Sequence, residues 1–367
     1  MATDCTLLPD LDSRWKQRLR RRLLSWYAKH ARDLPWRRNS DPYRIWISEV
    51  MLQQTQVESV IPYFRRFLQA FPTVRKLAAA QEQEVLRLWE GLGYYRRARG
   101  LHAAAKQIVS DHGGRFPSDL ASLQELPGIG RYTAGAIASI AFDQRAPILE
   151  ANTIRLLSRL IGFRGDPTRS AGQRLLWETA EVILPRKDVS AFNQALMELG
   201  SLVCTPAAPR CDECPVRVLC AANASGLQAE IPRAARKLKL TDLYEAAVVV
   251  QKKGQILLRQ CAPGERWAGL WDFPRFELES EGPPAVRDEL VEKVNAQTGV
   301  SIEPGDTFQT IKHGVTRYRI TLRCYQAHWT SGSVRSTAAR PVRWVKQREL
   351  ADYPLSTSGR KLAGLIR

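Results

Sequence analysis

The chain of 367 residues lacks features that define several large classes of protein. It has no apolar run approaching the roughly 20 residues that a membrane-spanning helix needs. Residues 1–14 carry acidic side chains and no apolar segment, so we expect no signal peptide. Internal repeats and low-complexity stretches are also absent from the sequence. With 44% hydrophobic and 25% charged residues, the composition predicts a globular protein of two or three domains.

Acidic residues are scarce relative to basic ones. There are 37 of the former and 55 of the latter, which gives a formal net charge of +18. The excess is spread along the chain, with one local concentration at residues 231–240, where four basic residues stand without an acid. A charge of this size favours a polyanionic partner, and DNA, RNA and an anionic membrane surface all satisfy it.

Cysteine is also infrequent, and four of the seven cysteines stand close together. Cys204, Cys211, Cys214 and Cys220 follow the spacing C-x6-C-x2-C-x5-C. Four thiolates on a short loop can hold zinc or an iron–sulfur cluster, and the spacing alone leaves both open. Such a loop suits a reducing compartment, where Cys5, Cys261 and Cys324 are expected to be isolated thiols.

The sequence texture changes near Gly226. Before it, apolar residues recur with helical spacing, and the segments end at proline and glycine. After a basic linker at residues 229–241, strand-like segments predominate. Helices are predicted at 15–30, 47–70, 82–91, 98–112, 133–142, 153–161, 173–184, 191–203 and 285–297, and strands at 246–251, 255–259, 318–325 and 342–344. The predicted organisation is therefore an all-α region (1–228), the linker, and an α+β domain (242–367).

A candidate DNA-binding motif lies at residues 126–135, which read LPGIGRYTAG. An L-P-G-x-G turn between two helices is typical of a helix–hairpin–helix. Gly128 and Gly130 allow the backbone to approach a phosphate closely, and N–H groups at the next helix start, beside Arg131, favour the anion. Such contacts position a duplex without reading its sequence.

Several motifs together resemble one family. They are LPW (34–36), WISEVMLQQTQ (46–56), GLGYY (91–95), the hairpin, FNQ (192–194), the cysteine loop and GLWDFP (269–274). In these the chain resembles the MutY-type adenine DNA glycosylases of the helix–hairpin–helix superfamily. The resemblance implies a multidomain protein with an all-α helix–hairpin–helix glycosylase region (hairpin at about 120–136), an iron–sulfur loop at 204–220, and an α+β Nudix-like domain that recognises 8-oxoguanine. It also implies a [4Fe–4S] cluster on the four cysteines, a monomer in the bacterial cytoplasm and nucleoid, and double-stranded DNA with A:8-oxoguanine or A:G mispairs as partner.

Removal of adenine needs an acid that protonates the purine and a carboxylate that stabilises the oxocarbenium-like sugar. Glu49 lies among apolar residues, where burial raises a carboxyl pKa, and the resemblance makes it the proton donor. Its alternative role is a structural acid. Residues 149–152 read LEAN where the family has Leu-Asp-Gly-Asn, so Glu150 replaces the catalytic aspartate with a side chain one methylene longer. We expect Glu150 to stabilise the sugar cation and Asn152 to organise it.

The resemblance also assigns roles around the acid. Tyr132 stands where the related endonuclease III-type enzymes carry a Schiff-base lysine, so a monofunctional glycosylase is expected. Tyr132 contacts the sugar or the acid, or packs at the hairpin. Gln54 and Thr55 are expected to contact the base opposite adenine. Leu92 and Tyr94 are expected to fill the gap that adenine leaves in the base stack; the alternative is that they are core residues.

The C-terminal domain departs from its family in two places. Residues 292–299 read EKVNAQTG, with Ala296 and Gln297 at the positions of the paired glutamates that hold Mg²⁺ in Nudix hydrolases, so no hydrolase activity is expected. Residues 313–317 read HGVTR, so Thr316 keeps a hydroxyl while a phenylalanine and a histidine are lost. Two competing functions stay open: a glycosylase for another mispaired or damaged base, and a mispair-binding protein weakened catalytically by Glu150.

Overall fold

The computed structural model describes residues 11–233 and 240–366. Cys5 and most of the basic stretch of the predicted linker, residues 234–239, lie outside the described residues. The chain divides into two compact units, Met1–Ala79 with Gly100–Arg236, and Ala80–Arg99 with Lys237–Arg367. The segment Ala80–Arg99 therefore clusters with the C-terminal part of the chain. Within the described ranges, no helix combines the length and apolarity needed to cross a bilayer.

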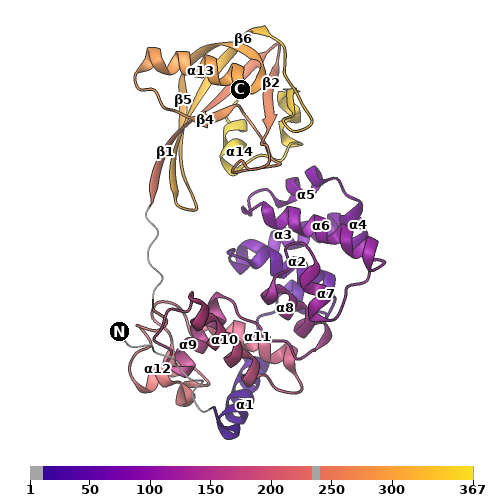
Figure 1. The fold of residues 1–367 in the computed structure, drawn as a ribbon, viewed down its shortest axis with the longest axis vertical. Coiled ribbons are helices and arrows are strands. Elements are labelled where there is room, and N and C mark those ends of the chain that lie inside the picture. Colours follow the sequence, from indigo (N-terminus) through magenta and orange to yellow (C-terminus); the bar gives the residue numbers. More distant parts are fainter. Residues whose placement is uncertain (1–10, 234–239, 367) are drawn as a thin grey trace. The chain divides into compact units, whose positions relative to one another are not determined.

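The first unit is helical, as the sequence predicts (Figure 1). The long helix α6 begins in the second unit and continues into the first. The helices are α1 (Ser13–His30), α2 (Pro42–Leu52), α3 (Val57–Ala70), α4 (Val74–Ala79), α6 (Arg96–Asp111), α7 (Leu120–Glu125), α8 (Arg131–Phe142), α9 (Ala151–Ile161), α10 (Ser170–Ile183), α11 (Val189–Leu202) and α12 (Ala221–Ala224), with 3-10 turns at Pro35–Arg37, Cys211–Glu213 and Arg217–Leu219.

One predicted helix is wrong in an informative way. The stretch 47–70 is two helices, α2 and α3, separated at residues 53–56. Gln54 takes a left-handed backbone conformation with φ of 57°, and Gln56 just before α3 is extended. No glycine or proline marks this break, so the apolar spacing continues through it in the sequence.

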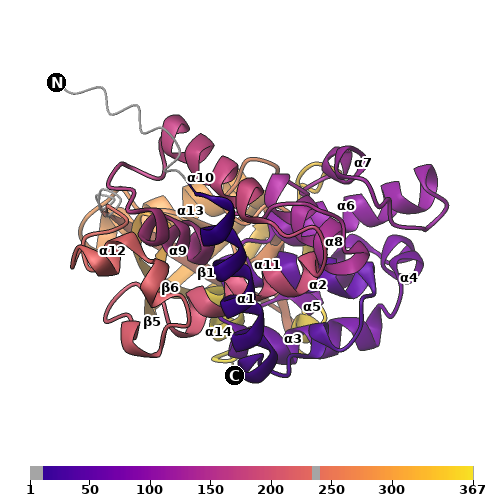
Figure 2. The same cartoon turned by 90° about the horizontal axis from the view of Figure 1, so that it is seen from below.

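Close packing of the helices depends on small residues. α8 contains Ala134, Gly135 and Ala136, all buried. A Cβ atom on Gly135 would lie 2.3 Å from the Pro147 carbonyl oxygen, so only glycine lets that segment approach the helix. α1 runs along α11 (Figure 2), and its Leu19 and Leu23 are fully buried in a core shared with α9, α10 and α11.

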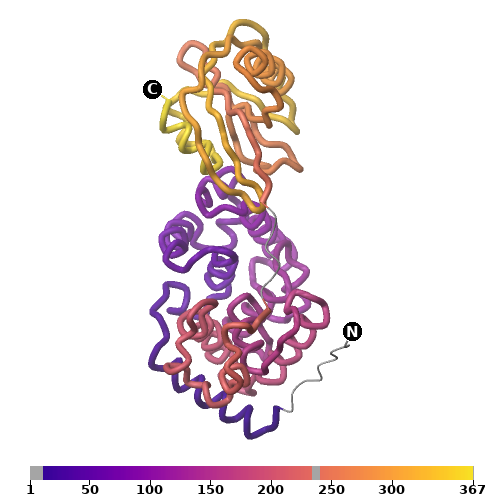
Figure 3. Tube along the Cα trace, turned by 90° about the vertical axis from the view of Figure 1, so that its left-hand side faces the viewer, coloured from indigo at the N-terminus to yellow at the C-terminus, as the bar shows by residue number. Residues whose placement is uncertain are grey.

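The second unit contains a mixed seven-stranded sheet, which confirms the α+β domain and the multidomain fold class. Its central path is β3-β2-β1-β6-β5, with β4 paired to β1 and β7 paired to β2, and β1 runs parallel to β6. The long antiparallel pair β5–β6 lies in the orange part of the tube in Figure 3. The elements are α5 (Glu82–Trp89), β1 (Thr241–Lys252), β2 (Gln255–Gln260), β3 (Trp271–Asp272), β4 (Arg275–Glu277), α13 (Pro283–Thr298), β5 (Val300–Val315), β6 (Tyr318–Gly332), β7 (Val342–Lys346), the 3-10 helix Gln347–Ala351 and α14 (Thr357–Ala363).

The sheet is covered on both faces. Along β1, Ala246, Val248 and Val250 belong to one apolar cluster with α13, whereas Ala247 and Val249 belong to a second cluster with residues of α14. This alternation follows from the two-residue period of a strand, and it explains why β1 reads as a continuous apolar run. The 16-residue strand β5 was not predicted, because Pro304, Gly305 and polar residues interrupt its apolar pattern.

Candidate active site and cysteine loop

The first unit contains a cavity of about 580 Å³ that gathers all four predicted catalytic residues. Its walls come from the turn at Pro35–Arg37, from α2 and the break after it, and from the first residues of α8 and α9 and the C-terminal half of α11. Six predicted site residues line it: Glu49, Gln54, Thr55, Tyr132, Glu150 and Asn152. Segments far apart in the sequence thus meet around one space large enough for a nucleobase.

Glu49 is the buried acid of this cavity. Its side chain extends from α2, the residue is 5% exposed, and the Tyr132 hydroxyl donates to its Oε2 at 2.5 Å. Burial raises the pKa of Glu49 to about 7, with the charge of Glu150 adding to the effect and the Tyr132 hydrogen bond and Arg37 opposing it. A carboxyl with this pKa is substantially protonated at neutral pH and can donate its proton.

Glu150 occupies the N-cap of α9. Its carboxylate accepts from the backbone N–H groups of Asn152 (2.8 Å) and Thr153 (2.9 Å), and from the Asn152 side-chain amide at 3.2 Å. Burial raises the pKa of Glu150, while these backbone hydrogen bonds counteract the rise by stabilising the anion. The longer side chain, bent back onto its own helix, makes the capping contacts that an aspartate usually makes.

Asn152 also links the helix start to the cysteine loop. Its side-chain oxygen accepts from Arg155 Nη2 at 2.9 Å, and the same guanidinium donates to the carbonyl oxygens of Cys204 (2.6 Å) and Gly200 (2.7 Å). Gly200 permits this approach, because a Cβ there would lie 2.8 Å from the Asn152 Cβ. One buried arginine therefore connects the first loop cysteine with the residue that holds Glu150.

A third carboxylate in the cavity wall was missed by sequence reasoning. Glu198 of α11 is fully buried and accepts from Arg32 (2.7 and 2.9 Å) and from Arg37 at 2.8 Å. Burial alone would raise its pKa, but the hydrogen bonds from the two arginines bring it down to about 2. The pKa values of two glutamates of one cavity are thus shifted in opposite directions by their surroundings. The sequence signal that could have identified Glu198 is that it is a lone acid inside the apolar stretch of α11.

The cysteine loop forms a separate site. Cys204, Cys211, Cys214 and Cys220 all line one cavity, together with apolar residues of α9 and with Arg159, whose Nη1 lies 3.3 Å from the Cys204 sulfur. Within the described residues, no three cysteine, histidine or acidic side chains converge closely enough to hold a single metal ion. A tetrahedral zinc ion would draw thiolates to about 3.8 Å from one another, since Zn–S bonds are about 2.3 Å long. In the structure the four thiols line one cavity without such convergence.

The comparisons with known proteins cover both units. A family model for "HhH-GPD superfamily base excision DNA repair protein" matches residues 47–181, and a NUDIX domain model matches residues 245–364. The adenine DNA glycosylase of Rattus norvegicus is 36% identical over 94% of this chain and 77% of its own length. The chain belongs to the adenine DNA glycosylase family. The adenine DNA glycosylase of Buchnera aphidicola subsp. Schizaphis graminum is 37% identical over 70% of this chain and 74% of its own. A solved thermostable thymine-DNA glycosylase covers 59% of this chain, with all of its own length aligned, at a TM-score of 0.53 and 27% identity.

Family membership makes this chain a DNA glycosylase of base excision repair, which hydrolyses the N-glycosidic bond of adenine. In this adenine DNA glycosylase the hairpin between α7 and α8 forms as predicted. Gly128 needs its left-handed φ of 78° and packs against Gly100, whereas a Cβ on Gly130 would meet nothing within 4 Å. Of the two predicted glycines, Gly130 is therefore the one with open space beside it. Arg131, the first residue of α8, stacks its guanidinium 3.9 Å from the centre of the Trp177 ring.

The predicted stack-filling residues lie in the second unit, in the turn that follows α5. Leu92 is 7% exposed, so its side chain belongs to the interior of the glycosylase. Tyr94 is 49% exposed and has a left-handed φ of 48°, which is unusual for a tyrosine. Of the two predicted stack-filling side chains, that of Tyr94 is exposed to solvent and that of Leu92 is buried.

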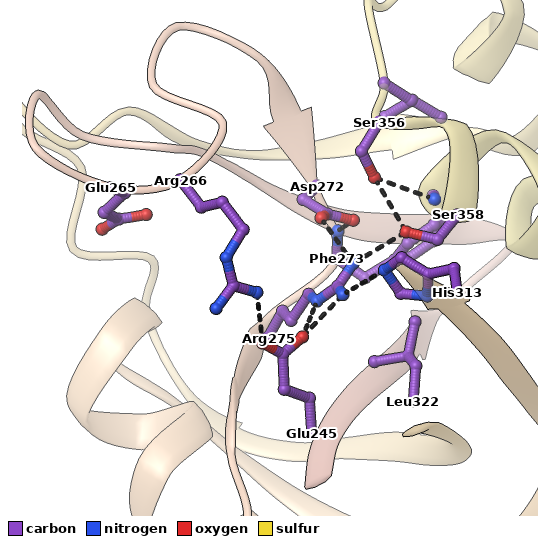
Figure 4. A network of polar contacts seen from close by, with 12 residues as sticks. Glu245, Glu265, Arg266, Asp272, Phe273, Arg275, His313, Leu322, Ser356 and Ser358 are labelled. Atoms are coloured by element: carbon purple, nitrogen blue, oxygen red, sulfur yellow. Dashed lines mark hydrogen bonds and ion pairs between the residues drawn. The ribbon is translucent and has the colours of Figure 1, made fainter. Parts of the chain in front are cut away.

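The Nudix-like domain of the glycosylase contains a buried polar network that the sequence did not reveal (Figure 4). Arg275 pairs with Glu245 at 2.6 Å and donates to Ser358 at 2.9 Å, and its guanidinium also lies 3.3 Å from His313 Nε2. Burial and the charge of Arg275 lower the pKa of His313. Thr316 lies in the exposed β5–β6 turn with φ of 51°, and its hydroxyl donates to the adjacent Val315 carbonyl oxygen at 2.7 Å.

Proposed function

We propose that this glycosylase removes adenine mispaired with 8-oxoguanine or guanine, and that Glu49 and Glu150 carry the chemistry. The observation that supports this most directly is the pair of carboxyls in one cavity, one with a pKa of about 7 and one whose carboxylate accepts from two backbone N–H groups at a helix N-terminus. Two carboxyls with different environments are what acid donation and cation stabilisation require.

In the proposed mechanism, Glu49 gives its proton to a ring nitrogen of adenine, and the bond between the base and C1′ of the sugar breaks. The bonding electrons leave with the base, and the sugar becomes an oxocarbenium-like cation. The Glu150 carboxylate, oriented by Asn152 and two backbone N–H groups, stabilises that cation until water adds to C1′ and gives its extra proton back to the Glu49 carboxylate. Tyr132 has no amine for a Schiff base, so the strand stays uncut.

The test is single-turnover excision, read as alkali-sensitive strand breaks in duplexes that carry A:8-oxoguanine, A:G or T:G. The parent should act on the two adenine mispairs and not on T:G. Glu150→Gln should lower the excision rate at least about a hundredfold while leaving duplex affinity nearly unchanged. The substitution removes the negative charge but keeps the side-chain volume. Excision by Glu150→Gln at the parent rate would refute the assignment. Preference for T:G would favour a glycosylase for another base, and binding without excision would favour a mispair-binding protein.

We further propose that the four cysteines hold a [4Fe–4S] cluster, with Arg159 supplying positive charge beside Cys204. Bound there, the group would tie four loop positions together and fix the surface they form. Metal analysis of the purified protein should find about four iron and four sulfide ions per chain. One zinc per chain without sulfide would contradict it. We expect a monomer that acts on nucleoid DNA in the bacterial cytoplasm.

A further inference from the structure

The segment Ala80–Arg99 is attached to the Nudix-like domain by side-chain hydrogen bonds. Both belong to one compact unit, although the segment falls inside the match to the HhH-GPD model. Two bonds join Gln83 to Gly269 O and Trp271 Nε1, each at 3.0 Å, and others join Arg87 to Ala351 O (2.6 Å) and Tyr95 to Leu355 O (3.4 Å).

The strongest link is the ion pair of Glu90 and Arg360. Arg360 donates through Nε to Glu90 Oε1 at 2.6 Å and through Nη2 to Oε2 at 3.0 Å. The Glu90 side chain is 7% exposed, so little water competes for it. The same guanidinium donates to the carbonyl oxygens of Leu350 and Tyr353, and Leu355 N–H donates to Glu90. A partly buried bidentate pair with these extra bonds fixes orientation as well as distance.

Glu90 is also the C-cap of α5, directly before the turn at residues 91–95. That turn is held from inside by two side chains. Trp89 Nε1 donates to Gly93 O at 3.1 Å, and Arg97 Nη2 donates to Leu92 O and Gly93 O at 3.2 and 3.3 Å. The Arg97 guanidinium also lies 5.5 Å from the centre of the exposed Tyr94 ring. A displacement of Glu90 would therefore move Tyr94 with it.

We propose that Glu90 and Arg360 are positioning residues, through which the Nudix-like domain sets the place of the Tyr94 ring during excision. The proposal rests on the proposed function and on the expectation from the sequence that Tyr94 fills the stack that adenine leaves. Neither residue touches the reacting atoms. Their effect on the rate passes through the turn, so it should disappear when the Tyr94 ring is absent.

A double-mutant cycle in the full-length protein tests this coupling with A:G duplex. Glu90→Gln removes one charge while keeping the shape of the side chain at position 90. It leaves in place the hydrogen bonds from Arg360 to the carbonyl oxygens of Leu350 and Tyr353. It should slow single-turnover excision about tenfold, since misplacement of about 1 Å can lower rates by up to a hundredfold. In a Tyr94→Ala background the same change should have less than a twofold effect. Arg319→Gln is the matched control, because Arg319 forms an exposed bidentate pair with Asp242 in the same domain.

A second measurement does not depend on activity. Amide hydrogen exchange of residues 91–95 should be at least about tenfold faster in Glu90→Gln than in the parent, and unchanged in Arg319→Gln. Equal exchange in Glu90→Gln and the parent, or rate effects that multiply in the double mutant, would overturn the proposal. If the parent excises no adenine while the exchange difference is present, the proposed function fails and the attachment of the turn stands.

Discussion

Replacing Glu49 with glutamine should stabilise the protein while removing its activity. The folded pKa of Glu49 is about 7, against an ordinary value of 4.5. Because the folded pKa is the higher one, the free energy of unfolding falls as pH rises between these two values and stays low above them. The difference between the two pKa values lowers the free energy of unfolding by about 3 kcal/mol at pH 8 and by about 1 kcal/mol at pH 5.

Glutamine has the shape of the protonated acid, cannot ionise, and retains an oxygen that accepts from the Tyr132 hydroxyl. The Glu49→Gln variant should therefore unfold with about 3 kcal/mol more free energy than the parent at pH 8. In a unit of this size that is an increase in Tm of about 6–12 °C. At pH 5 the gain should shrink to about a third. Excision should fall by about a hundredfold or more at either pH, since the proton donor is gone.

Scanning calorimetry of parent and variant at pH 5 and pH 8, with excision measured in parallel, checks the prediction. Glu198→Gln is the control from the same cavity, and its expected change in stability has the opposite sign. The folded pKa of Glu198 is about 2, so its ionised form stabilises the fold above the unfolded value of 4.5, and the variant should be the less stable protein at pH 8. A Glu49→Gln Tm that equals the parent's at pH 8, or that rises equally at both pH values, would refute the reasoning.

Two further predictions concern the acid and the hairpin. Because the Tyr132 hydrogen bond lowers the pKa of Glu49, Tyr132→Phe should move the alkaline limb of the excision rate to higher pH, and a limb that stays near pH 7 or moves down would contradict this. Gly130→Ala should leave stability within about 0.5 kcal/mol, since a Cβ there meets open space, yet weaken duplex binding in a titration at least about fivefold. Gly128→Ala, with φ of 78°, should instead destabilise the fold by about 1 kcal/mol, seen as a lower Tm.

Local patterns in the sequence predicted much of this protein. Helical spacing predicted most helices of the first unit, because the apolar face of a helix recurs every three to four residues. The motifs around Glu49, Tyr132 and Glu150 pointed to residues that line a single cavity. The break at Gln54 and the strand β5 were not predicted. The break carries no local signal that interrupts the helical period, and β5 carries none that establishes the two-residue period of a strand.

The sequence by itself determined the kinds of chemistry available: two acids near a hairpin, four cysteines on a loop, and an excess of positive charge. Tertiary structure alone decided in which direction the pKa of each acid shifts. Glu49 and Glu198 are identical side chains in one cavity, yet burial beside Glu150 raises one pKa while Arg32 and Arg37 lower the other. It also decided that Ala80–Arg99 belongs with the C-terminal unit, through the Glu90–Arg360 pair. Ionisation and docking depend on partners that are distant in sequence, and only folding brings those partners within hydrogen-bonding distance.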